Sequence, residues 1–391
     1  MYNIKKLNSI SGIVYDYLPK SDYLVSSHIE DADVDAYLVR SASCHEMEMS
    51  DRLLAFARAG AGVNNIPIPA CTEKGVVVFN TPGAIANGVK ELVIGGMIMA
   101  SRNVVAGVEW AKTLIGQGDQ VLKLVEKGKS QFVGPELSGK TLGVIGLGAI
   151  GVMVANAAAA IGMNVIGYDP YISVDHAWHL SRSIQHATNL DDLLTKSDYI
   201  TVHIPLMDKT KDFISSPEID KMKDGVIILN FARNGIIRNS SLFEGLESGK
   251  IAKYVTDFPT EDVLMHENTI CIPHLGASTP ESEENCAMMA AAQLREYIEY
   301  GSIKNSVNMP TCLLSAPAHF RVALIHKNLP GMVNQMTTII NNGGLNIEEM
   351  VNKSRGDIAY TVFDLSAQPD DAAIEALKAI EGVVKVRRIA H

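Results

Sequence analysis

Residues 141–170 read TLGVIGLGAIGVMVANAAAAIGMNVIGYDP. The apolar runs at 142–145 and 165–168 predict two buried parallel strands. The Ala-rich segment between them predicts a helix that ends at Gly162, because glycine is the common residue just past a helix C-terminus. Strand, tight turn, helix and strand in this order predict a doubly wound α/β fold.

Three glycines form a G-x-G-x-x-G pattern at the start of this helix. Gly146 permits the sharp turn, Gly148 lets the backbone approach a pyrophosphate, and Gly151 allows close packing of helix and strand. The helix N-terminus offers free N–H groups to the phosphates. Asp169 ends the second strand, where a carboxylate binds the ribose 2′-hydroxyl and repels a 2′-phosphate. The stretch therefore predicts NAD rather than NADP, with a Gly-rich turn that binds no ligand as the alternative.

The same stretch carries no charged residue from 141 to 168, a length that also fits a membrane span. Its six glycines, two asparagines and turn pattern argue against a span, and the nearby loops show no asymmetry of Lys and Arg. We therefore expect no membrane partner.

Composition limits the class of protein. A length of 391 residues predicts two or three domains, and a net charge of −10 argues against a nucleic-acid partner. The five cysteines are odd in number and lack C-x-x-C spacing, which predicts reduced thiols in a cytoplasmic protein without a metal site. The N-terminus MYNIKKLNSI lacks the apolar core of a signal peptide.

The segment before the glycine pattern predicts a small α/β unit that leads into two long helices. Its RAGAGVNNI sequence at 58–66 is a Gly-rich loop whose backbone N–H groups can face an anion, with a plain turn as the alternative. Strands are expected at 36–39 and 76–79, and helices at 50–58, 88–100 and 104–115.

After Asp169, helical stretches and apolar runs alternate, which predicts a parallel sheet with helices on both faces. Helices are expected at 190–195, 217–222 and 240–247, and strands at 199–204, 226–229, 251–256 and 269–272. Ligands of such sheets bind at the carboxyl ends of the strands. Arg233, Glu261 and His274 each follow one of the last three strands. Each alone is commonly a surface or turn residue, but their shared position makes them candidate catalytic groups.

The C-terminal part predicts one long helix at 280–300, begun by Thr279 and Pro280, and then a separate domain. Gly301 to Pro317 contains Pro and Ser and is expected to be a boundary. Strands at 320–326, 347–352, 359–365 and 383–389, with helices at 331–341 and 370–380, predict a ferredoxin-like βαββαβ unit.

At this point the chain resembles the D-2-hydroxyacid dehydrogenases, and among them those that act on D-3-phosphoglycerate and carry one C-terminal ACT domain. The matching sequences are VRS (39–41), RAGAGVNNI, EKGVVVFNTPGA (73–84), GLGAIG with Asp169, VHIPL (202–206), NFAR (230–233), DFPTE (257–261), PHLGAST (273–279) and IHKNLPG (325–331). The resemblance implies a flavodoxin-like substrate domain at 1–90 with 280–305, an inserted NAD-binding Rossmann domain at 91–279, and a regulatory ACT domain at 319–391.

The resemblance also implies the chemistry: D-3-phosphoglycerate is oxidised with NAD to 3-phosphohydroxypyruvate, at the start of phosphorylated L-serine biosynthesis. His274 suits the general base for the hydroxyl proton, because its pKa lies near neutrality. Glu261 would orient and charge-stabilise His274, and Arg233 would hold the substrate carboxylate and polarise the developing carbonyl.

The resemblance assigns further contacts. NAD contacts are expected from Gly146, Gly148, Ala149, Ile150, Gly151, Asp169, His203, Pro205, Phe231, Ala232, Arg233, Asp257, His274 and Gly276. Substrate contacts are expected from Arg40, Ser41, Ala61, Gly62, Val63, Arg233 and His274, with Arg40 on the phosphate. The sequence departs from the family at Thr256, which stands where the family has its nicotinamide-facing Asp. Because side chains alternate along a strand, Asp257 can replace that residue only at a bulge or a strand end.

In the C-terminal domain, His326, Asn328 and Asn346 correspond to positions that bind L-serine across a dimer interface. The resemblance thus implies L-serine as an effector and a homodimer or homotetramer; ordinary turn residues in a structural domain are the alternative. Two alternatives for function stay open: another NAD-dependent D-2-hydroxyacid dehydrogenase, and a non-catalytic NAD sensor similar to corepressors.

Overall fold

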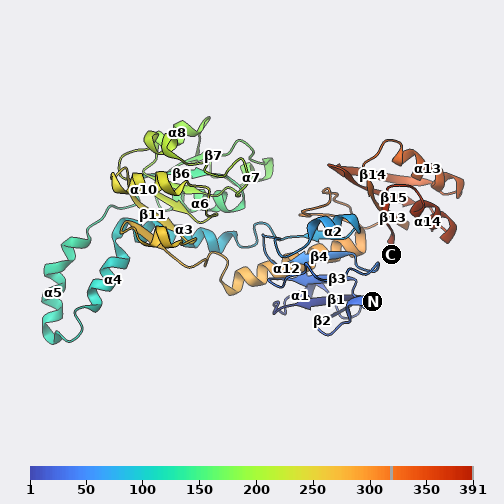
Figure 1. Ribbon diagram of the computed structural model, residues 1–391, viewed down its shortest axis with the longest axis horizontal. Helices are drawn as coiled ribbons and strands as arrows, with labels where there is room; N and C mark the ends of the chain where they lie inside the picture. Colours follow the sequence, from blue (N-terminus) through green and yellow to red (C-terminus); the bar gives the residue numbers. More distant parts are fainter. Residues whose placement is uncertain (318–319, 390–391) are drawn as a thin grey trace. The chain divides into compact units, whose positions relative to one another are not determined.

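The computed structural model describes residues 1–317 and 320–389. The chain divides into one unit formed by Met1–Ala84 with Pro280–His391 and a second, continuous unit, Ile85–Thr279 (Figure 1). The C-terminal domain therefore groups with the N-terminal segment. The functional division into substrate, NAD and regulatory domains stays a prediction.

Five parallel strands form the first unit's main sheet, in the order β2-β1-β3-β4-β5. This is the strand order of the flavodoxin-like fold, so the predicted fold of this segment is confirmed. The strands are β1 (Tyr2–Leu7), β2 (Tyr23–Ser26), β3 (Ala36–Val39), β4 (Ala55–Arg58) and β5 (Val77–Phe79), and the helices are α1 (Val14–Tyr17), α2 (Ile68–Glu73) and α12 (Pro280–Tyr300).

The predicted helix at 50–58 is wrong. Residues 51–52 form a turn, and β4 begins at Ala55 between β3 and β5, with Ala36 paired to Ala55. Phe56 and both flanking alanines are buried. A central parallel strand is covered on both faces and reads as a short apolar run, so periodicity alone cannot separate it from a helix.

Seven parallel strands form the sheet of the second unit, in the order β12-β11-β10-β9-β6-β7-β8. Numbered within the unit this is 3-2-1-4-5-6-7, the doubly wound order whose ligand crevice lies where the strand order reverses. The predicted Rossmann-type fold is confirmed. The strands are β6 (Thr141–Ile145), β7 (Asn164–Tyr168), β8 (Gln185–His186), β9 (Tyr199–Val202), β10 (Val226–Asn230), β11 (Ile251–Thr256) and β12 (Thr269–Cys271).

Helices cover both faces of this sheet. α3 (Ala86–Arg102) and α6 (Ala149–Ala160) share one buried core with β6. α8 (Leu190–Lys196), α9 (Ser216–Lys221) and α10 (Asn239–Glu247) pack in the core on the other face. The short helices α7 (Val174–Trp178) and α11 (Glu261–Leu264) lie in connections.

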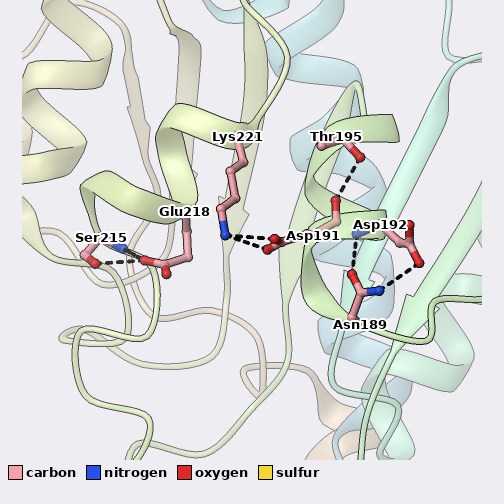
Figure 2. Close-up of polar contacts among 7 residues, drawn as sticks. All are labelled: Asn189, Asp191, Asp192, Thr195, Ser215, Glu218 and Lys221. Atoms are coloured by element: carbon pink, nitrogen blue, oxygen red, sulfur yellow. Dashed lines mark hydrogen bonds and ion pairs between the residues drawn. The ribbon is translucent and has the colours of Figure 1, made fainter.

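Polar contacts fix α8 and α9 beside each other (Figure 2). Asn189 caps α8 by accepting from the backbone N–H of Asp192 at 2.9 Å. Ser215 and Glu218 close the start of α9, where the Glu218 carboxylate accepts from the Ser215 N–H and hydroxyl. The Lys221 ammonium then donates to the Asp191 carboxylate of α8 at 2.8 and 2.9 Å.

Helices α4 (Val104–Lys112) and α5 (Val121–Gly128) bury no residue and project from the second unit (Figure 1). No single helix of residues 1–317 and 320–389 is long and apolar enough to cross a membrane. Only α3 and α4 taken together pass by length and composition, and they bend by 66° at their junction. Much of α3 is core, since Val93 and Met97 are fully buried.

The C-terminal domain has the predicted βαββαβ order, and its antiparallel sheet runs β14-β15-β13-β16. This is the ferredoxin-like arrangement. Both of its helices share a core with one face of the sheet. The elements are β13 (Phe320–Lys327), α13 (Met332–Asn342), β14 (Ile347–Arg355), β15 (Ile358–Leu365), α14 (Asp371–Lys378) and β16 (Val383–Ile389).

The other face of this sheet shares a core with α12 and the five-stranded sheet. Two arginines complete this seam. Arg321 donates to the Tyr300 carbonyl at 2.7 Å and forms a bidentate pair with Asp364. Arg387 donates to the carbonyls of Tyr297 and Ile298. The last carbonyls of a helix lack partners within the helix and favour cations, so the C-terminal domain caps α12.

Candidate functional site

The glycine turn of the second unit is built as the spacing suggests. Gly146 has φ +89°, and an added Cβ there would meet the His203 carbonyl oxygen at 2.6 Å. A Cβ on Gly151 would lie 1.9 Å from the Gly146 carbonyl oxygen, whereas nothing lies within 4 Å of one on Gly148. The outer glycines are thus needed by the fold. The middle one leaves open space beside the first turn of α6, which begins with Ala149 and Ile150.

Asp169 follows β7 directly, and the loop backbone fixes its carboxylate. Oδ2 accepts from the Leu147 N–H and Oδ1 from the Tyr171 N–H, both at 2.8 Å. Each carboxylate oxygen has two lone pairs, so the group can still accept from hydroxyl donors. Asp169 is therefore a held acceptor next to the glycine turn.

His203 and Pro205 follow β9. His203 Nε2 lies 3.0 Å from Thr201 Oγ1, while its Nδ1 is buried without a hydrogen-bond partner. Burial lowers the pKa of His203 to about 3, so the ring is neutral at physiological pH. Pro205 is exposed beside it. A neutral ring with a spare nitrogen is suited to a contact with a ligand, not to proton transfer.

The loop after β10 carries Phe231, Ala232 and Arg233. The Asn230 side chain shapes it by donating to the Arg233 carbonyl at 2.9 Å and accepting from the Ala232 N–H at 3.1 Å. Phe231 is buried against α3, where an added Cβ on Gly96 would meet its ring at 3.1 Å. Arg233 is exposed, and its Nη1 donates to the Ala232 carbonyl. The loop holds the guanidinium in solvent above the sheet edge.

The strand end after β11 separates the roles of Thr256 and Asp257. Thr256 Oγ1 donates to the Asn230 carbonyl and accepts from the Phe258 N–H, so its hydroxyl is occupied within the protein. β11 ends at Thr256, which is the strand end that a functional Asp257 requires. Asp257 is 1% exposed, and its Oδ1 has no hydrogen-bond partner. Burial raises the pKa of Asp257, opposed by the charge of His274 and by a backbone hydrogen bond from Gly276.

The ring of Phe258 gathers two of the three predicted catalytic residues. The His274 ring lies 4.5 Å from the Phe258 ring, centroid to centroid, and the Arg233 guanidinium carbon lies 5.7 Å from the same centroid. His274 is exposed. An acid–base group and a cation thus reach solvent side by side at the carboxyl edge of this sheet.

Glu261, the third predicted catalytic residue, begins α11 and is exposed. Among the contacts within residues 1–317 and 320–389, no hydrogen bond or ion pair joins it to His274. The structure therefore brings His274 and Arg233 together with Asp257, and it leaves Glu261 in solvent.

A dinucleotide fits these residues. The space over Gly148, the free N–H groups at the start of α6, and the held carboxylate of Asp169 match phosphate and ribose chemistry. The unpartnered buried atoms Asp257 Oδ1 and His203 Nδ1 supply polar capacity at the neighbouring strand ends. The carboxyl edge of the sheet thus offers contacts at several successive positions to one extended ligand.

In the first unit, Arg40 follows β3, and its Nη2 pairs with Glu283 Oε1 of α12 at 2.5 Å. Arg58, which the sequence analysis did not select, ends β4 and lies against Gly60, where an added Cβ would meet Arg58 Nη1 at 2.2 Å. The charges of both arginines affect the pKa of the buried Cys286 thiol. Burial raises this pKa, and the two positive charges lower it. The position of Arg58 directly before the Gly-rich loop was the available signal.

The other substrate candidates of this unit are mostly backbone positions. The Ser41 N–H donates to the Asn8 side chain at 3.0 Å, and the Ala61 carbonyl accepts from the Asn80 side chain at 2.7 Å. Gly62 and Val63 follow in the loop, both partly exposed. These contacts fix the loop around residue 61 next to Arg58.

The three predicted effector residues do not meet within one chain. His326 is buried, and its ring nitrogens bond to the Lys327 carbonyl at 2.7 Å and to Thr361 Oγ1 at 2.8 Å. Asn328 follows β13 beside Gly356, at the Ile358 end of β15, whereas the Asn346 carbonyl accepts from Ser366 at the Leu365 end. A shared site would need a second copy of the chain.

Residues 94–276 match the family described as D-isomer specific 2-hydroxyacid dehydrogenase, NAD binding domain. The D-3-phosphoglycerate dehydrogenase of Methanocaldococcus jannaschii is 36% identical over 85% of this chain and 62% of its own length. That of Escherichia coli K12 is 31% identical over 86% of this chain and 82% of its own. The match thus spans less than two thirds of the archaeal relative.

Solved structures agree. The NAD+-bound 3-phosphoglycerate dehydrogenase of Entamoeba histolytica has a TM-score of 0.60 and 29% identity, covering 78% of this chain and 98% of that one. Strand order, glycine turn and sequence similarity lead to the same result. Residues 94–276 form an NAD-binding domain, and the chain belongs to the D-isomer-specific 2-hydroxyacid dehydrogenase family.

Proposed function

We propose that the protein oxidises D-3-phosphoglycerate to 3-phosphohydroxypyruvate with NAD, the first step of phosphorylated L-serine biosynthesis. The observation that carries the proposal is the gathering of His274 and Arg233 around Phe258, at the same sheet edge as the glycine turn. The names of the curated relatives support this choice of substrate.

In the proposed reaction, NAD accepts the hydride from the alcohol carbon. His274 takes the hydroxyl proton, and its exposure leaves it free to pass that proton to solvent. Arg233 binds the substrate carboxylate bidentately and stabilises the developing carbonyl charge. A carboxylate would stabilise the imidazolium. The resemblance implies Glu261 for this role, and Asp257 is a second candidate because the charge of His274 acts to lower its pKa.

We assign the substrate phosphate to the first unit. Arg40 remains the predicted ligand, and Arg58 adds a second cation that acts on the same thiol, Cys286. Two guanidinium groups suit a phosphate dianion. The backbone of Ser41, Ala61, Gly62 and Val63 completes the proposed contacts.

We propose a homo-oligomer that uses the arm of α4 and α5. This arm buries no residue, yet Val104, Val105, Val108 and Leu122 on it are exposed. Grouped exposed apolar side chains of this kind mark association surfaces. Sedimentation tests this: replacing Val105 and Val108 with Ser should yield monomers, and an unchanged mass would contradict the assignment.

L-serine is the proposed effector, bound by Asn328 of one copy and Asn346 of another. Because both ring nitrogens of His326 are bonded within the protein, the structure supports a positioning role for His326. Calorimetry with L-serine tests the site on the unmodified protein and on Asn328→Ala. Absence of binding heat at millimolar serine would leave the C-terminal domain with an assembly role.

A cytoplasmic location belongs to the same proposal. All five cysteines are free in the structure, and thiols persist in reducing compartments. Labelling of intact cells with a reagent that does not cross membranes tests the location, because surface labelling of this protein would contradict it.

The function itself is tested with a panel of D-2-hydroxy acids and their 2-keto products, each with NAD and with NADP. Phosphoglycerate with NAD should give the highest kcat/KM, and Asp169→Ala should relax the preference for NAD because it removes the carboxylate that repels a 2′-phosphate. A higher kcat/KM for an unphosphorylated acid would make the protein another member of the family. Turnover of none would favour the NAD-sensing alternative.

A further inference from the structure

The proposed phosphate site of the first unit contains one negatively charged group, the carboxylate of Glu283. Its Oε1 lies 2.5 Å from Arg40 Nη2, and the two side chains are 46% and 41% exposed. We propose that Glu283 is an internal competitor of the substrate phosphate, which must displace it from Arg40 in order to bind. The inference rests on the proposed function only in assigning a phosphate to Arg40.

Neighbouring strand ends bring the two arginines of this site together. Arg40 directly follows β3, Arg58 is the last residue of β4, and Val39 is paired with Arg58 in the sheet register. In doubly wound sheets, ligands bind in the crevice outside the carboxyl ends of the strands. The edge of the five-stranded sheet therefore carries two arginines where a ligand is expected.

The packing of α12 fixes where Glu283 lies. Ala287 and Ala290 are buried in the core that this helix shares with the five-stranded sheet. Residues four apart lie on one face of a helix, so Glu283 continues the sheet-facing side of α12 one turn before Ala287. It also stands in the first turn, where the helix dipole favours a negative charge. The fold itself thus holds a carboxylate at the place where an anionic ligand would meet Arg40.

The buried Cys286 thiol shows that these charges share one small region. Burial raises its pKa, the charges of Arg58 and Arg40 lower it, and the charge of Glu283 raises it. With Glu283 on Arg40, two cations are partly neutralised by one anion. A phosphate monoester carries a charge of about −1.5 to −2 at pH 7, so it can replace a single carboxylate on the guanidinium.

The competition limits how tightly a phosphate is held. Substrate and product of the proposed reaction carry the same phosphate, so Glu283 weakens the binding of both to the same extent. A contact that is equal in the ground state and in the transition state changes KM and not kcat. Glu283 therefore lowers the affinity for phosphorylated ligands and favours release of the product.

The test compares Glu283→Gln with Glu284→Gln in the full-length protein. Both remove one negative charge from an exposed position of α12, but a step of one residue turns the side chain by about 100° around the helix. Inorganic phosphate is titrated at constant ionic strength and followed by thermal unfolding, because a ligand of the folded state raises the melting temperature.

Glu283→Gln should tighten phosphate binding by about two- to fivefold, the range expected for an exposed ion pair. The KM for phosphoglycerate should fall by the same factor, with kcat held. Glu284→Gln should change neither quantity. In the Arg40→Met background, Glu283→Gln should give no gain, because the competition requires the guanidinium.

Unchanged phosphate affinity in Glu283→Gln, including a failure of either protein to bind phosphate, would overturn the proposal. Weaker affinity would overturn it too, because Glu283 would then hold Arg40 in place for the phosphate. An equal gain in Glu284→Gln would reduce the effect to net charge and would also overturn it. Phosphate titration needs no turnover, so tighter phosphate binding without oxidation of phosphoglycerate would reject the proposed function and keep this inference.

Discussion

The carboxyl edge of the seven-stranded sheet and the seam between α12 and the C-terminal sheet differ in how they use polar groups. At the edge, His203 Nδ1 and Asp257 Oδ1 are buried without partners. At the seam, Arg321 is bonded to Asp364 and to two carbonyls, and both ring nitrogens of His326 are engaged. Both regions are rich in charged and polar side chains.

The difference separates binding from structure. Buried polar groups normally have hydrogen-bond partners, since leaving one unsatisfied costs about 1–3 kcal/mol. At the edge such atoms lie at the strand ends that carry the proposed ligand contacts, so they hold capacity for a ligand. At the seam the Tyr297 hydroxyl is also buried without a partner, but the arginines there are bonded and stabilise the fold. Changes at the edge should therefore cost function, and changes at the seam should cost stability.

The largest effect is expected at His274. His274→Ala should lower kcat by ~10²–10⁴, the range for a lost general acid–base group. Its melting temperature should hold because the ring is exposed. NAD binding should survive because most of the expected NAD contacts are made by other residues. The control is His266→Ala, which removes a ring stacked on Phe243 at 4.3 Å. Equal loss of kcat in both variants would contradict the assignment.

Arg321→Met should show the opposite pattern, which is a loss of stability rather than a loss of function. The side chain is 2% exposed, and its loss leaves the Asp364 carboxylate, which is 14% exposed, without its cation, a change that costs about 3–5 kcal/mol when the pair is buried. Urea unfolding measures the change. Arg388→Met removes an ion pair with an Asp371 that is 93% exposed, so it should cost at most about 1 kcal/mol. Similar losses of unfolding free energy in both variants would contradict the distinction between the ion pair at the seam and the ion pair at the surface.

Within the carboxyl edge of the sheet, two glycines three residues apart should respond differently to substitution by alanine. Gly148→Ala meets open space at a permitted φ of −73°, so the protein should fold while NAD binding weakens on the order of tenfold, or about 1.4 kcal/mol. Gly151→Ala places a Cβ 1.9 Å from a backbone oxygen and should lose stability as well. Fluorescence titration with NADH and thermal unfolding measure both. Unchanged NAD affinity in Gly148→Ala would show that the open space at Gly148 is not part of the NAD-binding site.

A further effect concerns pH where the C-terminal sheet meets the segment before β4. Lys385 donates to the Leu53 carbonyl, and burial lowers its pKa to about 8, below the usual value of about 10.4. Between these values the unfolded chain binds more protons, so this group adds stability as pH rises, by at most about 1.4 kcal/mol per pH unit. The added stability is lost again as pH falls through the folded value. Lys385→Met should remove this part of the pH dependence of unfolding, and an identical slope in the variant would contradict it.

Local rules predicted most of the fold. The glycine spacing, the apolar runs and the capping glycines located β6, α6 and β7 within a residue or two, and 280–300 was predicted as the helix that the structure has. β4 was missed because Ala55–Arg58 carries no periodicity, and its identity as a strand depends on pairing with β3 and β5.

The candidate site was predictable in its residue types but not in its contacts. Sequence order placed Arg233 and His274 after neighbouring strands, but the ring that gathers them, Phe258, has no pattern that marks it. Whether Thr256 or Asp257 faces the site depends on the residue at which β11 ends. Arg321 and Arg387 were unremarkable because their partners are backbone carbonyls of α12, distant in sequence.

The discontinuous first unit has a consequence for synthesis. The second unit is one continuous segment and can complete its core as it leaves the ribosome, whereas Met1–Ala84 must wait for Pro280–His391. At ~5–20 residues per second, that delay is on the order of tens of seconds. During it, the strands of the first sheet lack α12, and the apolar side chains that α12 covers are open to chaperones. The order of folding is thus expected to differ from the order of translation: the middle of the chain matures first, and the beginning matures with the end.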